Sequence, residues 1–270
     1  MATKMVKKEL TVLQNRRIAS DIYQIDCHDP EVAHGQAPGQ FYHIRCGSGW
    51  ELTLRRPISI AVQDAREQTV TLIYRAAGKG TTWLASRRRG DTLDVLGPLG
   101  NGFPLTAAPT VKRALLVGGG VGVPPLYGLA RDLHARGAVV DSILGFASRE
   151  AAFYVDEFRA FGSVAVATDD GTLGTRGRVT DLIESPYPWD VFYACGPLPM
   201  LRALQQLFAK TALDGYVSLE ERMGCGVGAC LACVCQLRTQ EPRLCERETQ
   251  LTQVKICSDG PVFPFREVVL

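Results

Sequence analysis

Residues Gly224–Gln236 read GCGVGACLACVCQ, which places four cysteines, at positions 225, 230, 233 and 235, within eleven consecutive residues. Such crowding is typical of disulfide scaffolds, metal sites and redox centres. The chain has nine cysteines, an odd number, and its first residues have no apolar core typical of a signal peptide. Disulfides are therefore disfavoured. Six of the nine cysteines follow position 224, which indicates a metal or cluster module in the C-terminal part of the chain.

The cysteine spacing narrows the kind of site. Cys225, Cys230 and Cys233 have the spacing C-x4-C-x2-C, which is that of plant-type [2Fe–2S] sites, completed there by one distant cysteine. Glycines at 224, 226 and 228 permit unusual backbone angles and let amide N–H groups approach sulfur. A structural zinc site more typically has two C-x2-C pairs, and only Cys230 and Cys233 form one here. The pattern favours a [2Fe–2S] cluster over zinc or buried free thiols.

Composition limits the remaining classes. A chain of 270 residues with 46% hydrophobic and 21% charged residues is long enough for two soluble domains and an appendage. A net charge of +2 gives no indication of nucleic-acid binding, and the short run Arg87–Arg89 is typical of a solvated surface. The longest uncharged run, Ala114–Ala130, contains five glycines and two prolines, so a membrane-spanning helix is disfavoured.

The hydrophobic pattern divides the chain into three segments. Short apolar runs such as Phe41–Arg45, Ile58–Val62 and Thr69–Tyr74 predict an antiparallel barrel or sandwich, with Gly97–Leu105 as a long irregular turn. From about Thr110, strand and helix patterns alternate, which favours a parallel sheet covered on both faces. The last segment is short and rich in glycine and cysteine. We predict domains at 1–108, 109–213 and 214–270.

Two clusters of residues in the first segment suit a flavin dinucleotide. Arg55–Ile60, RRPISI, combines cations, a rigid turn and a hydroxyl at the start of a strand. Gly78–Thr81, GKGT, is a glycine turn before a helical pattern, and free N–H groups at such turns bind phosphate. Each signal alone is also typical of a solvated β-surface. Together they predict an arginine at the pyrophosphate, the Ser59 hydroxyl near the isoalloxazine and a phosphate at the glycine turn.

The second segment contains a candidate nucleotide loop. Gly118–Pro125, GGGVGVPP, follows a strand and precedes a helix, although it matches neither G-x-G-x-x-G nor a P-loop. This context predicts phosphate binding at a sheet edge, and the alternative is a tight turn packed between sheet and helix. Another strand ends at a similar position, where Cys195 is either part of the site or a small buried hydrophobe. The candidate nucleotide contacts are Gly118, Gly119, Gly120, Gly122, Cys195 and Gly196.

The order of RPIS, a Gly-Thr turn, GGGVGVPPL and YACGPLPM resembles that of the ferredoxin–NADP reductase superfamily. SLEERMGCGVGACLACVC followed by ICSDGPVF narrows the resemblance to electron-transfer subunits of class 1B dihydroorotate dehydrogenases. The resemblance covers essentially the whole chain. It implies an FAD-binding antiparallel β-barrel, a parallel α/β domain that binds NAD and a small C-terminal [2Fe–2S] domain.

Site residues are carried over by motif. The FAD contacts implied by the resemblance are Arg56, Pro57, Ile58, Ser59, Ile73, Tyr74, Arg75, Gly80 and Thr81. The implied cluster ligands are Cys225, Cys230, Cys233 and Cys257, with Ala232 standing where relatives often have glycine. Cys257 also ends a strand-like stretch and enters the turn-forming SDGP, which suits the return of one thiolate to the loop. Cys235 and Cys245 are the other candidates for the fourth ligand.

The function implied by the resemblance is a relay without acid–base residues of its own. FAD exchanges a hydride with NAD and single electrons with an iron–sulfur centre. In this family, electrons from dihydroorotate leave an FMN in a separate catalytic subunit, cross the cluster to FAD and reduce NAD+. The same role here would belong to de novo pyrimidine (UMP) biosynthesis, in a cytoplasmic heterotetramer of two copies of each subunit.

Other functions remain open from the sequence. One alternative is a reductase subunit of another flavin/iron–sulfur complex, of the hydrogenase or ferredoxin:NAD(P) transhydrogenase type. Another is a zinc-stabilised, nucleotide-binding regulatory protein without redox chemistry. The choice between NAD and NADP is also open, since Ser148 and Arg149 are either a site for a 2′-phosphate or surface polar residues. Following the family, we predict NAD.

Overall fold

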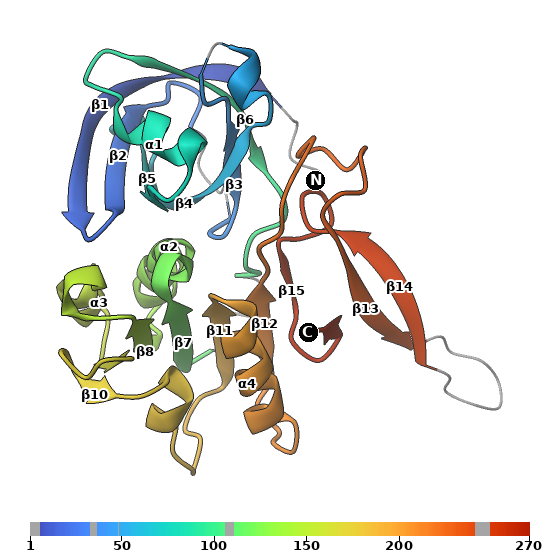
Figure 1. The fold of residues 1–270 in the computed structure, drawn as a ribbon. Helices are drawn as coiled ribbons and strands as arrows, with labels where there is room; N and C mark the ends of the chain where they lie inside the picture. The colour runs from blue at the N-terminus through green and yellow to red at the C-terminus, as the bar shows by residue number, and fades with distance from the viewer. Residues whose placement is uncertain (1–5, 33–36, 48, 106–110, 241–248) are drawn as a thin grey trace.

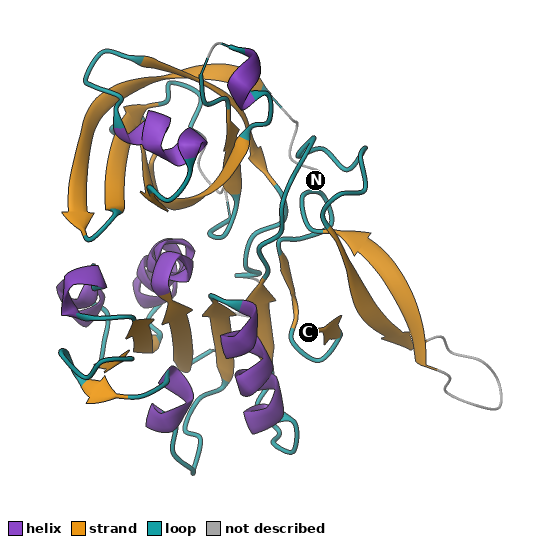
Figure 2. Cartoon of the chain, in the orientation of Figure 1, coloured by secondary structure: helices purple, strands orange, loops and turns teal. Residues whose placement is uncertain are grey.

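The computed structural model describes residues 6–32, 37–47, 49–105, 111–240 and 249–270. Figures 1 and 2 show a β-barrel above a sheet that is flanked by helices, with the C-terminal part of the chain beside both. Within the described residues, no helix is long and apolar enough to cross a membrane.

The barrel is closed and antiparallel, with the strand order β1-β2-β5-β4-β3-β6. Side chains alternate along its strands, so one face, with Leu10, Tyr42 and Leu72, fills the interior. The irregular turn predicted at Gly97–Leu105 begins only after Leu99. Leu99 pairs with Phe41 of β3, so strand β6 continues as far as Leu99. The elements are β1 (Lys7–Ala19), β2 (Ile22–His28), β3 (Phe41–Ile44), η1 (Trp50–Leu52), β4 (Arg56–Asp64), β5 (Thr69–Arg75), α1 (Lys79–Ala85) and β6 (Thr92–Leu99).

The α/β part is a sheet of order β10-β9-β8-β7-β11-β12-β15, parallel except for its last strand. Ala114 and Leu116 of β7 pack toward α2, whereas Leu115 and Val117 pack toward α4, because β7 is covered on both faces. The elements are β7 (Arg113–Gly119), η3 (Gly120–Gly122), α2 (Val123–Ala135), β8 (Val139–Phe146), η4 (Arg149–Ala151), α3 (Val155–Arg159), β9 (Val164–Thr168), β10 (Thr175–Arg176), η5 (Val179–Leu182), β11 (Val191–Cys195), α4 (Leu198–Phe208), β12 (Gly215–Ser218) and β15 (Val262–Pro264).

The strand order of this sheet reverses between β7 and β11. In open α/β sheets such a reversal leaves a crevice at the carboxyl ends of the two strands, and ligands bind there. The predicted nucleotide residues at the ends of β7 and β11 therefore lie at the position that the topology favours for a ligand. The predictions of an antiparallel barrel and a parallel α/β sheet are confirmed.

The cysteine-rich segment lies between β12 and β15, which pair with each other at one edge of the parallel sheet. Both ends of residues 219–261 are therefore anchored in that sheet. Two strands of this part, β13 (Val234–Gln240) and β14 (Thr249–Lys255), form a three-stranded antiparallel sheet with β16 (Val268–Val269), which follows β15. Figure 1 shows the β13–β14 hairpin extending away from the rest of the molecule.

Candidate flavin cleft and cysteine loop

A cleft of about 690 Å³ opens between the barrel and the segment Ser218–Met223. This volume is within the range of small-molecule and cofactor sites. The predicted flavin contacts on β4 and β5 all line the cleft, namely Arg56, Pro57, Ile58, Ser59, Ile73, Tyr74 and Arg75. The cleft is also lined by residues that were not predicted as flavin contacts: Phe41, Leu54, Arg55, Val121, Ser218, Leu219, Glu220, Glu221, Arg222, Met223 and Pro261.

The two arginines at the start of β4 have different roles. Arg55 is held by the barrel, since its guanidinium donates to the Asp94 carboxylate at 2.7 Å and to the carbonyls of Asp94 and His43. Arg56 instead lies against Gly80 at the start of α1. A Cβ on Gly80 would lie 2.9 Å from Arg56 Nε, so a larger residue there would displace the arginine side chain. The Arg56 guanidinium donates to the carbonyl of Leu54 at 2.6 Å, and Arg56 lines the cleft together with Arg75 and Arg222.

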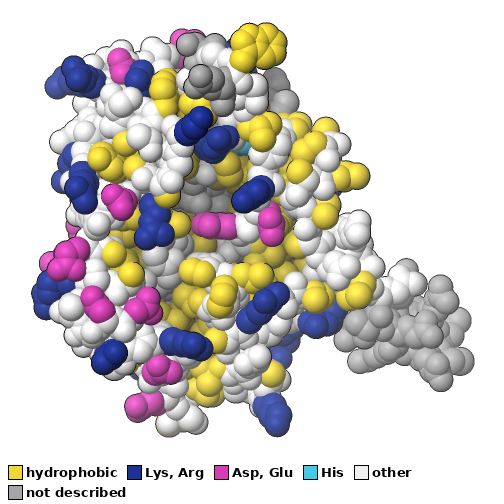
Figure 3. Space-filling view, viewed as in Figure 1, with side chains coloured by type: hydrophobic (Ala, Val, Ile, Leu, Met, Phe, Trp, Pro, Cys, Tyr) yellow, Lys and Arg dark blue, Asp and Glu magenta, His cyan; other side chains and the backbone are white. Residues whose placement is uncertain are grey.

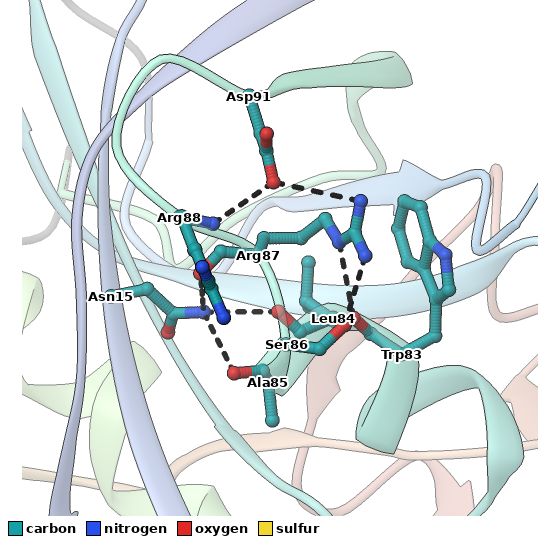
Figure 4. A network of polar contacts seen from close by, with 8 residues as sticks. All are labelled: Asn15, Trp83, Leu84, Ala85, Ser86, Arg87, Arg88 and Asp91. Carbon is teal, nitrogen blue, oxygen red and sulfur yellow. Dashed lines mark hydrogen bonds and ion pairs between the residues drawn. The ribbon is translucent and has the colours of Figure 1, made fainter.

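Figure 4 shows how the helix beside Arg56 is anchored to the barrel. Asn15 of β1 donates to the carbonyls of Leu84 and Arg87 at 3.0 Å, which satisfies backbone groups at the end of α1. The guanidinium of Arg87 lies 4.2 Å from the centre of the Trp83 ring and pairs with Asp91 at 3.5 Å. Arg88 and Arg89 are exposed, as predicted for a solvated surface, whereas Arg87 is partly buried and is held by stacking and an ion pair.

The wall opposite the barrel carries two carboxylates, Glu220 and Glu221, and one cation, Arg222. In Figure 3, acidic and basic side chains face one another across the hollow between barrel and sheet. The side chain of Glu220 reaches solvent in the cleft. Protein atoms surround its carboxyl, and this partial loss of solvation raises the pKa of the carboxyl. The acidic residues of SLEERMG had no recognised role in the sequence, because only the fold brings them opposite Arg56.

The candidate nucleotide loop follows β7 as predicted. A Cβ on Gly122 would lie 2.2 Å from the carbonyl oxygen of Cys195, and one on Gly119 would lie 2.8 Å from Met200 Sδ. These glycines therefore allow close packing against the end of β11 and the start of α4, which is the tight-turn alternative. Gly120, at φ +52°, faces open space, and Val121 lines the cleft. The loop can serve both packing and ligand binding.

Cys195 and Arg149 lie where their side chains have other partners. The thiol of Cys195 is in the core of the α/β part, and burial raises its pKa. Only its backbone and Gly196 are near the nucleotide loop. Arg149 donates from Nε to the carbonyl oxygen of Thr172 at 3.1 Å and is otherwise exposed. The structure thus leaves the choice between NAD and NADP as a prediction.

The four cysteines assigned to the cluster are arranged as two pairs. The backbone N–H of Cys225 donates to Cys230 Sγ, and that of Cys230 donates to Cys225 Sγ, each at 3.4 Å. The thiols of Cys233 and Cys257 hydrogen-bond to each other in the core. Within the part of the chain that the structure describes, no three His, Cys, Asp or Glu side chains form a one-ion site. A [2Fe–2S] cluster takes two ligands on each iron, which suits two pairs.

Backbone amides in the cysteine loop favour thiolates. Burial opposes ionisation of Cys225, but N–H groups of Val227, Cys230 and Ala229 donate to its sulfur and lower its pKa to about 6. Gly228 N–H donates to Cys257 Sγ at 3.1 Å, which joins the two pairs. Hydrogen bonds to sulfur also stabilise the charge of an iron–sulfur cluster. The residues therefore fit the cluster predicted from their spacing.

Cys235 and Cys245 are the two alternatives to Cys257 as the fourth cluster ligand. Cys235 lies on β13, partly buried, and burial raises its pKa to about 11, just as burial raises the pKa of Cys257 to about 12, so ionisation does not separate these two cysteines. Cys245 lies outside the described residues. The assignment of Cys257 as the fourth ligand stays a prediction, which its contact with the loop supports.

Two residues of β3 join the cleft to the cysteine loop. Phe41 lines the cleft and also belongs to the apolar core that contains Cys233 and Cys257. His43 is fully buried, and burial, followed by the charge of Arg55, lowers its pKa to about 4. His43 lies two positions after Phe41, on the same outward face of β3. Its ring lies against Gly226 of the cysteine loop. Neither residue carried a sequence signal, because each reads as an ordinary strand position.

Comparisons with known proteins agree with this site. Residues 220–269 match the model of the iron-sulfur cluster binding domain of dihydroorotate dehydrogenase B. The chain is 52% identical to the "Dihydroorotate dehydrogenase B (NAD(+)), electron transfer subunit" of Bacillus caldolyticus over 98% of this chain and 99% of the relative. It is 50% identical to the subunit of the same name from Geobacillus sp. (strain WCH70), over 98% and 100%.

Solved structures support the same fold. A structure described as an NADH-dependent reduced ferredoxin-NADP oxidoreductase superposes with a TM-score of 0.80 at 29% identity, over 96% of this chain and 89% of that one. A ferredoxin NADP+ reductase from Neisseria gonorrhoeae, with bound FAD and NADP, gives a TM-score of 0.64 at 16% identity, over 80% and 94%, and bears on the fold alone. Since it shares half of its residues with the curated relatives over nearly its whole length, the chain belongs to the family of electron transfer subunits of dihydroorotate dehydrogenase B.

Proposed function

We propose that this chain passes electrons to NAD+ through a [2Fe–2S] cluster and FAD, as the electron transfer subunit of a dihydroorotate dehydrogenase. The observation that carries the proposal is the wall shared by the two sites. Phe41 lines the flavin cleft and packs in the same core as Cys233 and Cys257. The two cofactor sites would therefore both border one buried side chain of β3.

Bound FAD supplies the exchange between two-electron and one-electron carriers. The chain's own part is to bind, orient and shield. Arg56 faces the cleft and would pair with the pyrophosphate, while Gly80 gives its guanidinium room and Thr81 accepts the N–H of Gly78 at 3.2 Å to shape the turn. Ser59 and Tyr74 line the cleft beside it and would contact the flavin rings.

The nucleotide would approach from the sheet. Val121, between the glycines of the loop, lines the same cleft as Ser59 and Tyr74. A nucleotide on Gly118–Gly122 and at the backbone of Cys195 and Gly196 would therefore reach the flavin side of the cleft. Glu220 and Glu221 stand on the opposite wall of the cleft.

The proposed partner is an FMN-containing catalytic subunit that oxidises dihydroorotate, in a heterotetramer with two copies of each chain. The curated relatives are named electron transfer subunits, and a subunit of that kind requires a separate catalytic one. On the cysteine loop, Val227 and Leu231 are 40% and 64% exposed. Apolar side chains exposed beside a redox centre suit contact with another protein. A cytoplasmic location and a role in pyrimidine biosynthesis belong to this proposal.

The test separates relay from catalysis. The purified chain should contain FAD and iron and should oxidise NADH with artificial electron acceptors, but it should not oxidise dihydroorotate alone. Adding the catalytic subunit should restore dihydroorotate-dependent reduction of NAD+. Robust dihydroorotate oxidation by the isolated chain would contradict the proposal, as would a colourless protein that binds zinc.

A second candidate is a subunit of a ferredoxin-linked NADP oxidoreductase, which the TM-score of 0.80 with such an enzyme favours. The same preparation distinguishes the two. Rapid reduction of ferredoxin, together with no response to the dihydroorotate-oxidising subunit, would favour this second function.

A further inference from the structure

His43 is placed between the two proposed redox sites. It lies on β3, opposite Pro57 of the flavin-binding strand β4, and is fully buried. Tyr42 and Ile44, its neighbours in the chain, point into the barrel, so His43 points outward from it, toward the cysteine-rich segment. The side chain is therefore part of the boundary between the barrel and the cysteine loop.

The ring of His43 occupies space at the ligand loop itself. A Cβ on Gly226 would lie 2.4 Å from His43 Nδ1 and 3.1 Å from two carbon atoms of the ring. Gly226 is buried, has φ +74° and follows the cluster cysteine Cys225 directly. The imidazole thus lies where any other residue at position 226 would place its side chain.

The polar atoms of this ring make no well-formed hydrogen bond to protein. In the described part of the chain, neither Nδ1 nor Nε2 of His43 has a partner at good hydrogen-bond geometry, although both are buried. Burial has the largest effect on the ring and lowers its pKa, although the backbone of Arg55 and of Cys225 lies close enough to favour the protonated form. An imidazole carries at least one N–H in either protonation state. Buried donors in folded proteins almost always have an acceptor. The loop in contact with this ring is the one whose sulfurs would hold a negatively charged cluster.

We propose that one ring N–H of His43 hydrogen-bonds to a sulfur of the [2Fe–2S] centre on the Cys225 loop, and so raises the reduction potential of that centre. The inference rests on the proposed function, since it requires the cluster. Reduction adds negative charge to the cluster, and a hydrogen bond to sulfur stabilises the reduced form more than the oxidised form. His43 is a positioning residue as well, because the same contact holds the cysteine loop against the flavin-binding strand.

A role in filling space predicts something different. If the ring only fills the gap beside Gly226, an apolar side chain of similar volume should leave the potential unchanged. A residue with an N–H group should then have no advantage over one without it. The two roles are therefore separable by variants that differ in hydrogen-bonding ability more than in size.

The experiment compares His43→Leu, His43→Asn and His43→Gln in the full-length chain. Asn and Gln place an amide N–H near the positions of Nδ1 and Nε2, respectively, whereas Leu has no donor. The control is Ser142→Ala on β8 of the parallel sheet. Like the His43 ring nitrogens, the Ser142 hydroxyl is a buried polar group without a hydrogen-bond partner among the described residues. The cluster midpoint potential is measured by redox titration with paramagnetic resonance, and iron content is measured in each variant.

His43→Leu should change the ratio of reduced to oxidised cluster at a fixed potential by roughly tenfold, a fall of about 59 mV for a one-electron couple. At least one of the two amide variants should keep most of the original potential, and Ser142→Ala should not change it. The flavin potential should stay the same in all variants. Unchanged potential in His43→Leu, or an equal fall in all three His43 variants, would overturn the inference.

A spectroscopic measurement decides the case in which substitution prevents cluster assembly. In the unsubstituted chain labelled with ¹⁵N only at histidine, the reduced cluster should show a ¹⁵N coupling from a hydrogen-bonded ring nitrogen. Absence of this coupling would overturn the inference whatever the variants do. An unsubstituted protein with no iron would instead refute the proposed function, which is a separate result.

Discussion

Gly226→Ala should damage the cysteine loop far more than an ordinary change of glycine to alanine. The new methyl group would lie 2.4 Å from His43 Nδ1, in a fully buried contact with a side chain that cannot move into solvent. Overpacking of this kind costs about 1–3 kcal/mol. The backbone at φ +74° adds about 1–2 kcal/mol for a residue with a Cβ. The expected total is about 2–5 kcal/mol, concentrated beside Cys225.

The matched control is Gly137→Ala, in the turn after α2. Its φ of +88° is similar, but a Cβ there would meet no atom within 4 Å, so only the backbone part of about 1–2 kcal/mol remains. The assay is iron per chain together with the temperature at which the visible absorbance of the cluster is lost. Gly226→Ala should bind less iron and bleach at a lower temperature than Gly137→Ala.

A second substitution tests the cause. Adding His43→Ala to Gly226→Ala removes the contact but leaves the backbone strain, so the double variant should recover part of the lost iron. If Gly226→Ala matches Gly137→Ala in both measurements, the reasoning from the contact is refuted. The same holds if the two substitutions are simply additive.

Three further predictions concern the flavin contact, the fourth cluster ligand and the amino-terminal edge of the parallel sheet. Arg56→Gln should weaken FAD retention by roughly tenfold to a hundredfold, since a hydrogen bond to a charged group contributes about 1.5–3 kcal/mol; the exposed Arg45→Gln is the control in a flavin-release assay. Cys257→Ser should lose iron and the reduced-state resonance signal, whereas Cys235→Ser should keep both; the reverse pattern would refute the ligand assignment. The pKa of Asp190 is lowered from 3.8 by N–H groups at the start of β7, so the stability it contributes is present above that value and is lost as pH falls through the lowered pKa. Asp190→Asn should make the unfolding temperature less sensitive to acid, and an unchanged pH profile would contradict this.

Much of the cofactor assignment could be predicted because the relevant signals are local. Cys225, Cys230 and Cys233 lie in one short loop, so their spacing by itself restricts which metal centre the loop can wrap. Strand and helix periods in residues 111–208 likewise predict a parallel sheet with its ligand edge after β7. Such features depend on neighbours a few residues apart, which the sequence displays directly.

Pairs of similar residues were separated only by the fold. Arg55 and Arg56 are adjacent and both line the cleft, yet the Arg55 guanidinium pairs with the Asp94 carboxylate whereas that of Arg56 donates to the carbonyl of Leu54. Cys195 reads as a site residue by its position at a strand end, but its thiol points into the core. Which face of a strand is buried depends on what packs against it, and no local pattern contains that information.

The sequence by itself determined the kinds of cofactor site, through the cysteine spacing, the glycine loop after β7 and the RPIS strand. Only the tertiary structure decided how these sites meet. The placement of Glu220 opposite the barrel, the position of Phe41 between cleft and cysteines, and the contact of His43 with Gly226 each join residues more than a hundred positions apart. Electron transfer between two centres depends on their separation and surroundings, and these are set by the packing of the barrel against the segment held between β12 and β15.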